Sequence, residues 1–278
     1  MTIQNTNHPT TSDIELNNIC IAGHAHYPRI NNVSCTFHSG EVIVIIGPNG
    51  AGKSSLLHAL TGQLPYNQGQ IHLFGRPLAH WPMQRRAQHV AFLPQKHQLS
   101  QPFLVSDIIA LARLNQTGTQ QQNQKIIRNA LEAFDAARFY DRCYTELSGG
   151  EQQRVHLARV FAQLNALSIS SQRPGLLLLD EPTTGLDLAH QQHLISAIRQ
   201  SARNGLTVLA SLHNLSLTSQ LATRVLCLDR GEIKAFGTVT QVMEPSLLSA
   251  VFKTKLQTIS PSNLSTPLLY LDYSTMVN

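Results

Sequence analysis

The chain has 278 residues, of which 42 % are hydrophobic and 13 % charged, so it can bury the core of one large domain or two small ones. Its formal net charge is +5, but the basic residues are dispersed, with Arg85 and Arg86 as the only adjacent pair, which disfavours nucleic-acid binding. No apolar run approaches the roughly 18 residues that a membrane-spanning helix needs. The N-terminal segment also lacks the basic and apolar regions of a secretory signal. We therefore expect no secretory signal and no membrane span.

Histidine and cysteine form no metal-binding pattern in the sequence. His190 and His193 are three residues apart on an expected helix, a spacing that usually belongs to a solvated helix face, so we expect no metal there. The four cysteines lack the C-x-x-C spacing and are expected to be reduced thiols of a cytosolic protein: Cys20, Cys35, Cys143 and Cys227.

The N-terminal region predicts short strands that lead to a glycine-rich loop. Residues 1–12 are polar, and strands are expected at residues 14–22 and 32–37. A turn at Ser39 and Gly40 leads into residues 42–46, whose β-branched side chains favour a buried strand.

The segment Gly47 to Ser54 matches the phosphate-binding pattern G-x-x-x-x-G-K-[ST], and a helix predicted for residues 53–60 ends at Gly62. Glycines allow backbone N–H groups to face a phosphate, and the helix N-terminus adds a favourable dipole. Lys53 and the Ser54 hydroxyl are suited to the β/γ-phosphates and to Mg²⁺. A chance glycine-rich turn is the alternative, but the Lys-Ser pair and both flanking elements argue against it. The predicted nucleotide-binding residues are Gly47, Pro48, Asn49, Gly50, Ala51, Gly52, Lys53, Ser54 and Ser55.

A mostly helical insert at residues 96–160 follows two further strands. The second strand is stopped by Pro94, with Gln95 just beyond it. Residues 115–124 are polar and are interpreted as a low-complexity linker. The strands are expected at residues 70–74 and 89–93, and apolar periodicity predicts helices at residues 105–114, 125–137 and 149–164.

The third of these helices opens with Leu-Ser-Gly-Gly-Glu-Gln-Gln-Arg, residues 147–154. Ser148 and Glu151 have the spacing of a capping box, which explains these two residues without a ligand. It does not explain Gly149 and Gly150, each of which costs roughly 1 kcal/mol of helix propensity. Bare N–H groups at a helix start suit a phosphate, so a second phosphate-binding helix end is predicted here.

Alternating strands and helices resume in the C-terminal half and predict a mainly parallel sheet with helices on both faces. The strand at residues 176–180 ends in Asp180 and is followed by Glu181, at the sheet edge where ligands collect. Paired carboxylates there favour Mg²⁺ binding by Asp180 and polarisation of a water by Glu181. The other elements are a helix at 189–203, strands at 207–212 and 225–228, a hairpin arm at 231–237 and a polar extension at 252–278.

Over about residues 12–255, the order of these motifs resembles that of the nucleotide-binding subunit of an ABC transporter. The resemblance implies an α/β fold with a P-loop NTPase (RecA-like) core, a mainly parallel sheet, an N-terminal antiparallel β part and an inserted α-helical subdomain. It implies a single ABC ATPase domain over residues 1–278. Its parts would be a core at about 12–95 and 161–255, a helical subdomain at about 96–160 and a polar extension at 256–278.

The resemblance implies ATP and Mg²⁺ as ligands and two copies that meet head to tail. Each ATP would lie between the phosphate-binding loop of one copy and the family's signature motif, residues 147–151, of the other. Ser148, Gly149 and Gly150 would then act in trans, with Asp187 of the D-loop also counted among the nucleotide-binding residues. Glu181, His213 and Gln95 are the expected catalytic residues, and Ser54, Gln95 and Asp180 the expected metal ligands. Tyr27 is expected to stack on adenine, with His24 as the second choice.

Two features depart from the family pattern. Residues 165–174, after the signature helix, form a longer segment than usual. His213 is followed by Asn214 where Asp is more usual, which would alter a helix cap without changing His213 itself.

Residues 92–113 resemble the ATPases of bacterial importers for iron-siderophores, cobalamin and haem, and residues 157–164 and 188–191 are similar to the hemin-import type. This implies a peripheral protein on the cytoplasmic face of the inner membrane, two permease subunits and, indirectly, a periplasmic hemin-binding protein. The ATPase itself would not touch hemin. Two alternatives remain open: the same role with ferric siderophore or cobalamin as cargo, and a soluble ABC ATPase for cluster assembly or repair.

Overall fold

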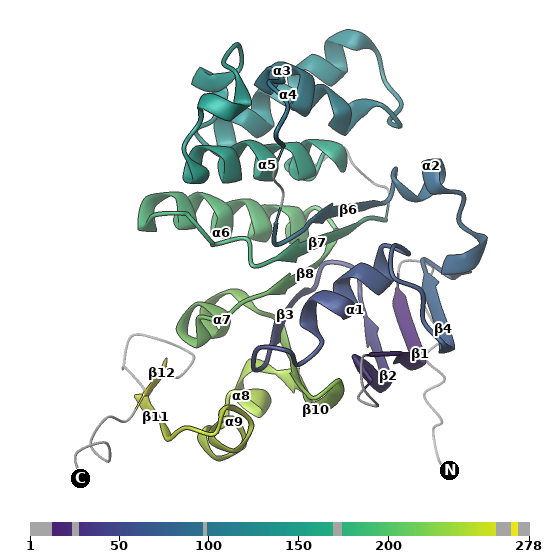
Figure 1. Ribbon diagram of the computed structural model, residues 1–278, viewed down its shortest axis with the longest axis vertical. Coiled ribbons are helices and arrows are strands. Elements are labelled where there is room, and N and C mark those ends of the chain that lie inside the picture. Colours follow the sequence, from purple (N-terminus) through teal and green to yellow (C-terminus); the bar gives the residue numbers. More distant parts are fainter. Residues whose placement is uncertain (1–12, 24–27, 97–98, 169–173, 260–267, 272–278) are drawn as a thin grey trace, which may run out of the picture.

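The computed structural model describes residues 13–23, 28–96, 99–168, 174–259 and 268–271 (Figure 1). Within them, a six-stranded sheet has the order β10-β9-β3-β8-β7-β6. Its strands are parallel neighbours except β10, which pairs antiparallel with β9 at one edge, so the predicted mainly parallel sheet is confirmed. The strands are β3 (Val42–Ile46), β6 (Val90–Leu93), β7 (Leu176–Asp180), β8 (Thr207–Ser211), β9 (Arg224–Asp229) and β10 (Glu232–Thr238).

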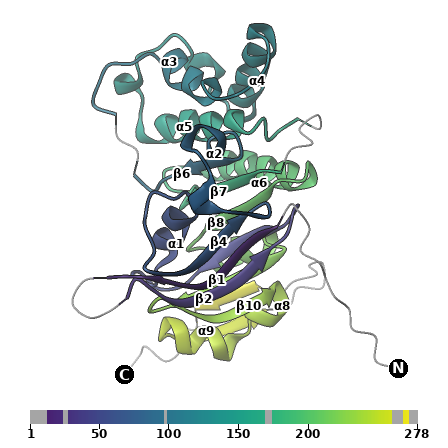
Figure 2. The ribbon, with the colours of Figure 1, turned by 90° about the vertical axis from the view of Figure 1, so that its right-hand side faces the viewer.

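A four-stranded antiparallel sheet of order β2-β1-β4-β5 forms the predicted N-terminal β part. Helix α1 (Lys53–Leu60) packs between this sheet and the central one (Figures 1 and 2), because Leu56, Leu57 and Leu60 share one apolar cluster with side chains of both sheets. The strands are β1 (Ile14–Ile21), β2 (Ile30–Phe37), β4 (Gln68–Leu73) and β5 (Arg76–Pro77).

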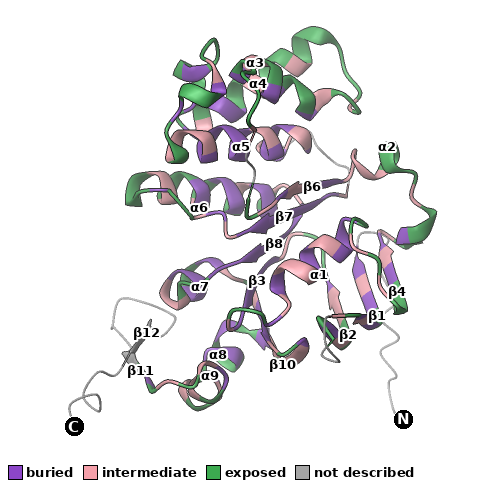
Figure 3. Cartoon of the chain, viewed as in Figure 1, coloured by how far each residue is buried: buried purple, intermediate pink, exposed green. Residues whose placement is uncertain are grey.

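The central strands are buried on both faces, as the continuous apolar runs in the sequence require. In β3, Val42, Val44 and Ile46 face one apolar cluster, and Ile43 and Ile45 face the other. Figure 3 shows the result, with β7 and β8 buried throughout and the outer helices exposed on one side. This packing fixes the carboxyl ends of β3, β7 and β8, where the site lies.

The helical insert packs over the sheet face that carries α6 (Leu188–Arg203), with α3 (Val105–Ala110) and α4 (Gln120–Ala133) above α5 (Gly149–Gln163) in Figure 1. The predicted start of α4 was wrong. The Thr119 side chain accepts a hydrogen bond from the Gln122 N–H and starts the helix inside the predicted linker. Glutamine favours a helix but also suits a polar linker, so composition alone could not distinguish the two. The other short helices are η1 (Leu78–His80), α2 (Met83–Arg86), η2 (Leu111–Arg113), η3 (Ala137–Phe139) and η4 (Tyr144–Glu146).

The C-terminal part contains elements that the sequence did not predict. Asn214 accepts a hydrogen bond from the Leu217 N–H and caps α7 (Leu215–Leu221), so the unusual Asn after His213 keeps a cap in place. Part of the segment interpreted as a polar extension pairs as an antiparallel hairpin of β11 (Leu256–Ile259) and β12 (Leu268–Leu271). Before it come α8 (Val239–Val242) and α9 (Pro245–Phe252). Among the helices of the described residues, none has the length and apolarity needed to cross a bilayer.

Candidate nucleotide-binding site

The loop after β3 can take its shape only with glycine at two positions. A Cβ on Gly47 would lie 2.1 Å from the Leu228 carbonyl oxygen, and one on Gly52 would lie 2.5 Å from the Arg29 carbonyl oxygen. Gly50 has φ 78° but no atom within 4 Å of such a Cβ, so its glycine serves the backbone conformation and leaves open space above the loop. The predicted strand, loop and helix are therefore confirmed as local structure.

Lys53, the first residue of α1, folds back over the loop. Its Nζ donates hydrogen bonds to the Gly47 and Pro48 carbonyl oxygens at 2.8 and 3.0 Å, and the residue is only 6 % exposed. Burial lowers the pKa of Lys53, while the carboxylates of Glu181 and Asp180 oppose this shift. A cation therefore lies at the base of the loop, suited to an anionic ligand.

A cavity of about 680 Å³ opens above this loop. It brings together residues 49–55 of the loop with Gln95, Glu181 and His213, three predicted site residues from three other parts of the chain. Arg29 also lines it, and sequence reasoning missed this residue because no motif surrounds it. The signature residues and Asp187 are not among the lining residues of the described chain.

Asp180, at the end of β7, is held by the neighbouring strand. Its Oδ1 accepts a 2.6 Å hydrogen bond from the Ser211 hydroxyl, whose oxygen in turn accepts one from the Glu181 N–H at 2.9 Å. Ser211 is the register partner of Asp180 in β8, so only the strand pairing could have revealed its role. In the described structure, Asp180 Oδ2 is buried and has no hydrogen-bond partner. An unpaired carboxylate oxygen of this kind fits a hard cation or its water ligand.

Glu181 faces His213 across the ends of β7 and β8. Its Oε1 lies 2.6 Å from His213 Nε2, and its side chain is 18 % exposed against 49 % for His213. The backbone of Glu181 has φ 50°, in the left-handed region. Burial raises the pKa of Glu181, but hydrogen bonds from His213 and Gln95, together with the nearby charge of Lys53, outweigh it and hold the pKa below its ordinary value. The carboxylate is thus anionic at neutral pH and able to accept a proton or orient a water molecule.

The predicted capping box at the start of α5 is confirmed: the Ser148 side chain accepts from the Glu151 N–H, and Glu151 Oε2 accepts from the Ser148 N–H. The two glycines that follow differ. Nothing lies within 4 Å of a Cβ on Gly149, but one on Gly150 would lie 2.6 Å from the Gly185 carbonyl oxygen. Close packing against Gly185 therefore explains the glycine at position 150, which the sequence did not reveal. No such contact explains the glycine at position 149.

One residue has a different environment from the one the sequence suggested, and two others lie outside the described residues. His190 was expected on a solvated helix face, but its side chain is 23 % exposed and hydrogen-bonded to Arg154. His193 is exposed, as expected. Tyr27 and His24, the candidates for adenine stacking, lie outside the described residues.

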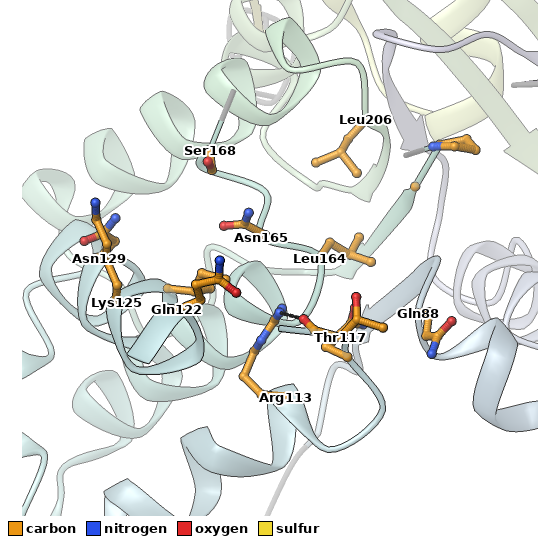
Figure 4. Close-up of a pocket in the computed structure, with 14 residues that line it drawn as sticks. Gln88, Arg113, Thr117, Gln122, Lys125, Asn129, Leu164, Asn165, Ser168 and Leu206 are labelled. Atoms are coloured by element: carbon orange, nitrogen blue, oxygen red, sulfur yellow. Dashed lines mark hydrogen bonds between the residues drawn. The ribbon is translucent and has the colours of Figure 1, made fainter. Parts of the chain in front are cut away.

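A second cavity of about 400 Å³ lies between the helical insert and the core and is separate from the loop (Figure 4). Arg113 lines it, but its guanidinium donates to the Ala162 and Gln163 carbonyl oxygens at the end of α5 and to Asn123 Oδ1. The bonds to the two carbonyl oxygens cap the C-terminus of α5. The role of Arg113 in this cavity is therefore structural.

Comparison with known proteins agrees with this arrangement. Residues 30–184 match the family described as ABC transporter. The chain is 48 % identical to the hemin import ATP-binding protein HmuV of Pseudomonas fluorescens, over 77 % of this chain and 82 % of that protein. It is 42 % identical to the protein of the same name from Pseudomonas entomophila, over 80 % and 86 %.

Solved structures share the fold. An ATP-binding subunit of an ABC transporter matches with a TM-score of 0.74 at 24 % identity, over 86 % of this chain and 96 % of that chain. A dimeric bacterial ABC transporter cassette matches with a TM-score of 0.71 at 21 % identity, over 81 % and 98 %. The P-loop NTPase core with its helical insert is thus the fold of these cassettes. Together with the family match and the curated relatives, this shows that the chain belongs to the ABC transporter family.

Proposed function

We propose that this chain is the ATP-binding subunit of a bacterial ABC importer for hemin. The observation that carries the proposal is its 37–48 % identity, over most of its length, to curated proteins named for hemin import. Ferric siderophore or cobalamin import would use the same machinery with another cargo.

In this proposal, residues Gly47 to Ser55 bind the phosphates of ATP. Lys53, which now donates to two carbonyl oxygens of the loop, would turn to the β- and γ-phosphates. Ser54, Gln95 and Asp180 would hold Mg²⁺, a set supported by their hard oxygen donors and by the unpaired Oδ2 of Asp180. When bound, this ion would neutralise charge on the phosphate oxygens.

Hydrolysis would depend on positioning and electrostatics, as in other phosphoryl transfers. Glu181 would orient the attacking water and accept its proton, a role supported by its anionic state and its place in the cavity. His213 would hold Glu181 in position and contact the γ-phosphate, and Gln95 would join the site to the helical insert. Tyr27, or His24 in its place, would stack on adenine.

Two copies of the chain would assemble head to tail around two ATP molecules. The signature residues Ser148, Gly149 and Gly150, with Asp187, would complete the site of the partner copy. This is supported by their absence from the lining of the described chain's own cavity, and a solved cassette of the same fold is dimeric.

The assembled pair would sit on the cytoplasmic face of the inner membrane beneath two permease subunits, with a periplasmic hemin-binding protein delivering the cargo. In this arrangement the chain acts as one ABC ATPase domain. The subdomain at about residues 96–160 would pass the motion of the core at about 12–95 and 161–255 to the permease. Residues 256–278 have no assigned role.

The deciding experiment uses the complex of this chain with its permease in lipid vesicles. ATP is supplied on the side of the membrane that carries this chain, and the binding protein on the opposite side. Binding proteins loaded with hemin, ferric siderophore or cobalamin are added in turn. We expect ATP-dependent uptake and stimulated hydrolysis only with hemin. Stimulation by the siderophore or cobalamin protein alone would transfer the proposal to that cargo. Failure to co-purify with any membrane permease would favour a soluble ABC ATPase.

A further inference from the structure

A buried arginine joins the signature helix to the segment after β7. Arg154 of α5 is 5 % exposed, and its NH1 donates to the Asp135 carbonyl oxygen at 2.9 Å and to His190 Nε2 at 2.7 Å. Asp135 also accepts from the same nitrogen through Oδ2. His190 belongs to α6, the helix that Asp187 caps by accepting from the His190 N–H. The guanidinium therefore contacts the insert and the D-loop region at once.

The geometry of this contact favours one tautomer of His190. Arginine has only donors, so Nε2 of His190 must accept, and the ring proton must then lie on Nδ1. Nδ1 lies 2.7 Å from Asp187 Oδ1 and donates to it. The competing arrangement, an imidazolium that donates from Nε2 to Asp135 Oδ2, has a separation of 3.5 Å, against 2.7 Å to the guanidinium. The neutral Nδ1–H form fits the geometry better.

Two further contacts connect the same two elements. Gln153 Nε2 donates to the Pro182 carbonyl oxygen at 3.0 Å, in a buried position, and Gly150 packs against Gly185. The first turns of α5 and residues 181–187 are therefore held together at several points. Of these, only the Arg154–His190–Asp187 chain reaches the cap of α6. Through side chains alone, it connects α5, which carries the signature residues, to Asp187, an expected nucleotide-binding residue.

We propose that His190 is a positioning residue for ATP hydrolysis: as a neutral imidazole it accepts from Arg154 and donates to Asp187, which fixes the D-loop relative to the signature helix. This inference rests on the proposed function. It assigns His190 no contact with nucleotide. Its loss should lower the turnover of the assembled dimer and leave the binding of ATP to a single chain unchanged.

Three substitutions separate the two hydrogen bonds of the ring. His190→Gln places an amide oxygen near the position of Nε2, so it keeps the acceptor for Arg154. His190→Asn keeps a donor near Nδ1 for Asp187 but has no group that reaches Arg154, and His190→Ala loses both. His193→Ala is the matched control, since His193 lies on the same helix with its ring 5.8 Å from that of His190 and is exposed.

The measurements are kcat and KM for ATP with the full chain, and the affinity of the isolated chain for a fluorescent ATP analogue. We expect His190→Ala and His190→Asn to lower kcat about tenfold, the scale of one hydrogen bond to a charged group. His190→Gln should also lower kcat, because it keeps the acceptor for Arg154 but has no donor that reaches Asp187, and all variants should bind the analogue as the wild type does. Hydrolysis that stays within twofold of the wild type in any of the three variants overturns the proposal, because each variant lacks at least one of the two bonds. A wild-type chain that hydrolyses no ATP would instead contradict the proposed function.

A measurement on the wild-type chain keeps the test valid if a variant fails to fold. The ¹⁵N chemical shifts of the His190 ring at pH 7 report which nitrogen carries the proton. We expect a protonated Nδ1 and a bare Nε2. The opposite tautomer, or an imidazolium, contradicts acceptance from Arg154.

Discussion

Nε2 of His213 lies 2.6 Å from Oε1 of Glu181, which joins the residue after β7 to the segment after β8 at the mouth of the cavity. Each side chain is attached to a buried strand end, and Ser211 fixes the backbone of Glu181 between them. The carboxylate is thereby oriented before any nucleotide binds.

Glu181→Gln should separate binding from hydrolysis. The amide has the same shape but cannot accept the proton of the attacking water, so we expect turnover to fall about 10²-fold or more. Nucleotide affinity should be retained, and ATP should hold the variant as a closed dimer, visible by size-exclusion chromatography. Near-normal hydrolysis would remove Glu181 from the catalytic role.

The same carboxylate predicts a dependence of stability on pH. The folded-state pKa of Glu181 lies below the ordinary value of 4.5. Its contribution to stability is therefore present above about pH 4.5 and lost as the pH falls through the folded-state pKa. Urea unfolding at pH 7 should show Glu181→Gln to be less stable than the wild type, and the difference should shrink below pH 4.5. In a His213→Ala background the difference at pH 7 should already be smaller, because His213 supplies one of the hydrogen bonds.

Lys53→Ala should weaken nucleotide binding itself, by roughly tenfold or more, because a charge-assisted contact to phosphate is lost. Equilibrium titration of the isolated chain with a fluorescent ATP analogue measures this. Lys125→Ala is the matched control, since Lys125 lines the second cavity of Figure 4 and should have no effect. Equal losses in both variants would contradict the assignment of the loop.

Ser148→Arg should leave ATP binding by the single chain intact and abolish hydrolysis, because in the proposed dimer the bulky cation would block the helix end that faces the partner copy. If the site is composite, mixing Ser148→Arg with Lys53→Ala should restore part of the activity, since one site of the mixed dimer then has both wild-type halves. Loss of single-chain binding in Ser148→Arg would contradict action in trans.

The adjacent glycines should respond differently to alanine. Gly150→Ala introduces a Cβ 2.6 Å from the Gly185 carbonyl oxygen, so unfolding free energy should fall by about 1–3 kcal/mol. Gly149→Ala meets no atom within 4 Å and should be neutral or stabilising by about 0.4–1 kcal/mol. Thermal and urea denaturation of the two variants compare them directly, and equal destabilisation would contradict the packing argument.

The residues that could be predicted from the sequence lie in continuous motifs. The loop before α1, the acids at the end of β7 and the capping box of α5 each carry their chemistry within about eight residues of chain, where spacing and propensity decide the structure. The meeting of the loop and the acids at one edge of the sheet followed from the parallel strand pattern.

The residues that were missed depend on contacts between distant segments. Ser211 holds Asp180 through strand register, Arg29 enters the cavity from the start of β2, and Arg154 reaches His190 from another helix. A single sequence contains no local signal for such contacts. The early start of α4 was missed for a different reason, because a run of glutamines suits both a helix and a linker.

The bonds from Lys53 to the Gly47 and Pro48 carbonyl oxygens have a consequence for how fast ligands come and go. The loop is already folded around the Lys53 ammonium group, so an arriving phosphate replaces the two carbonyl oxygens as hydrogen-bond partners of the lysine. Little of the chain then has to be ordered when the ligand binds. In the proposed dimer, the rate of nucleotide release should then be governed by the opening of the two-chain assembly.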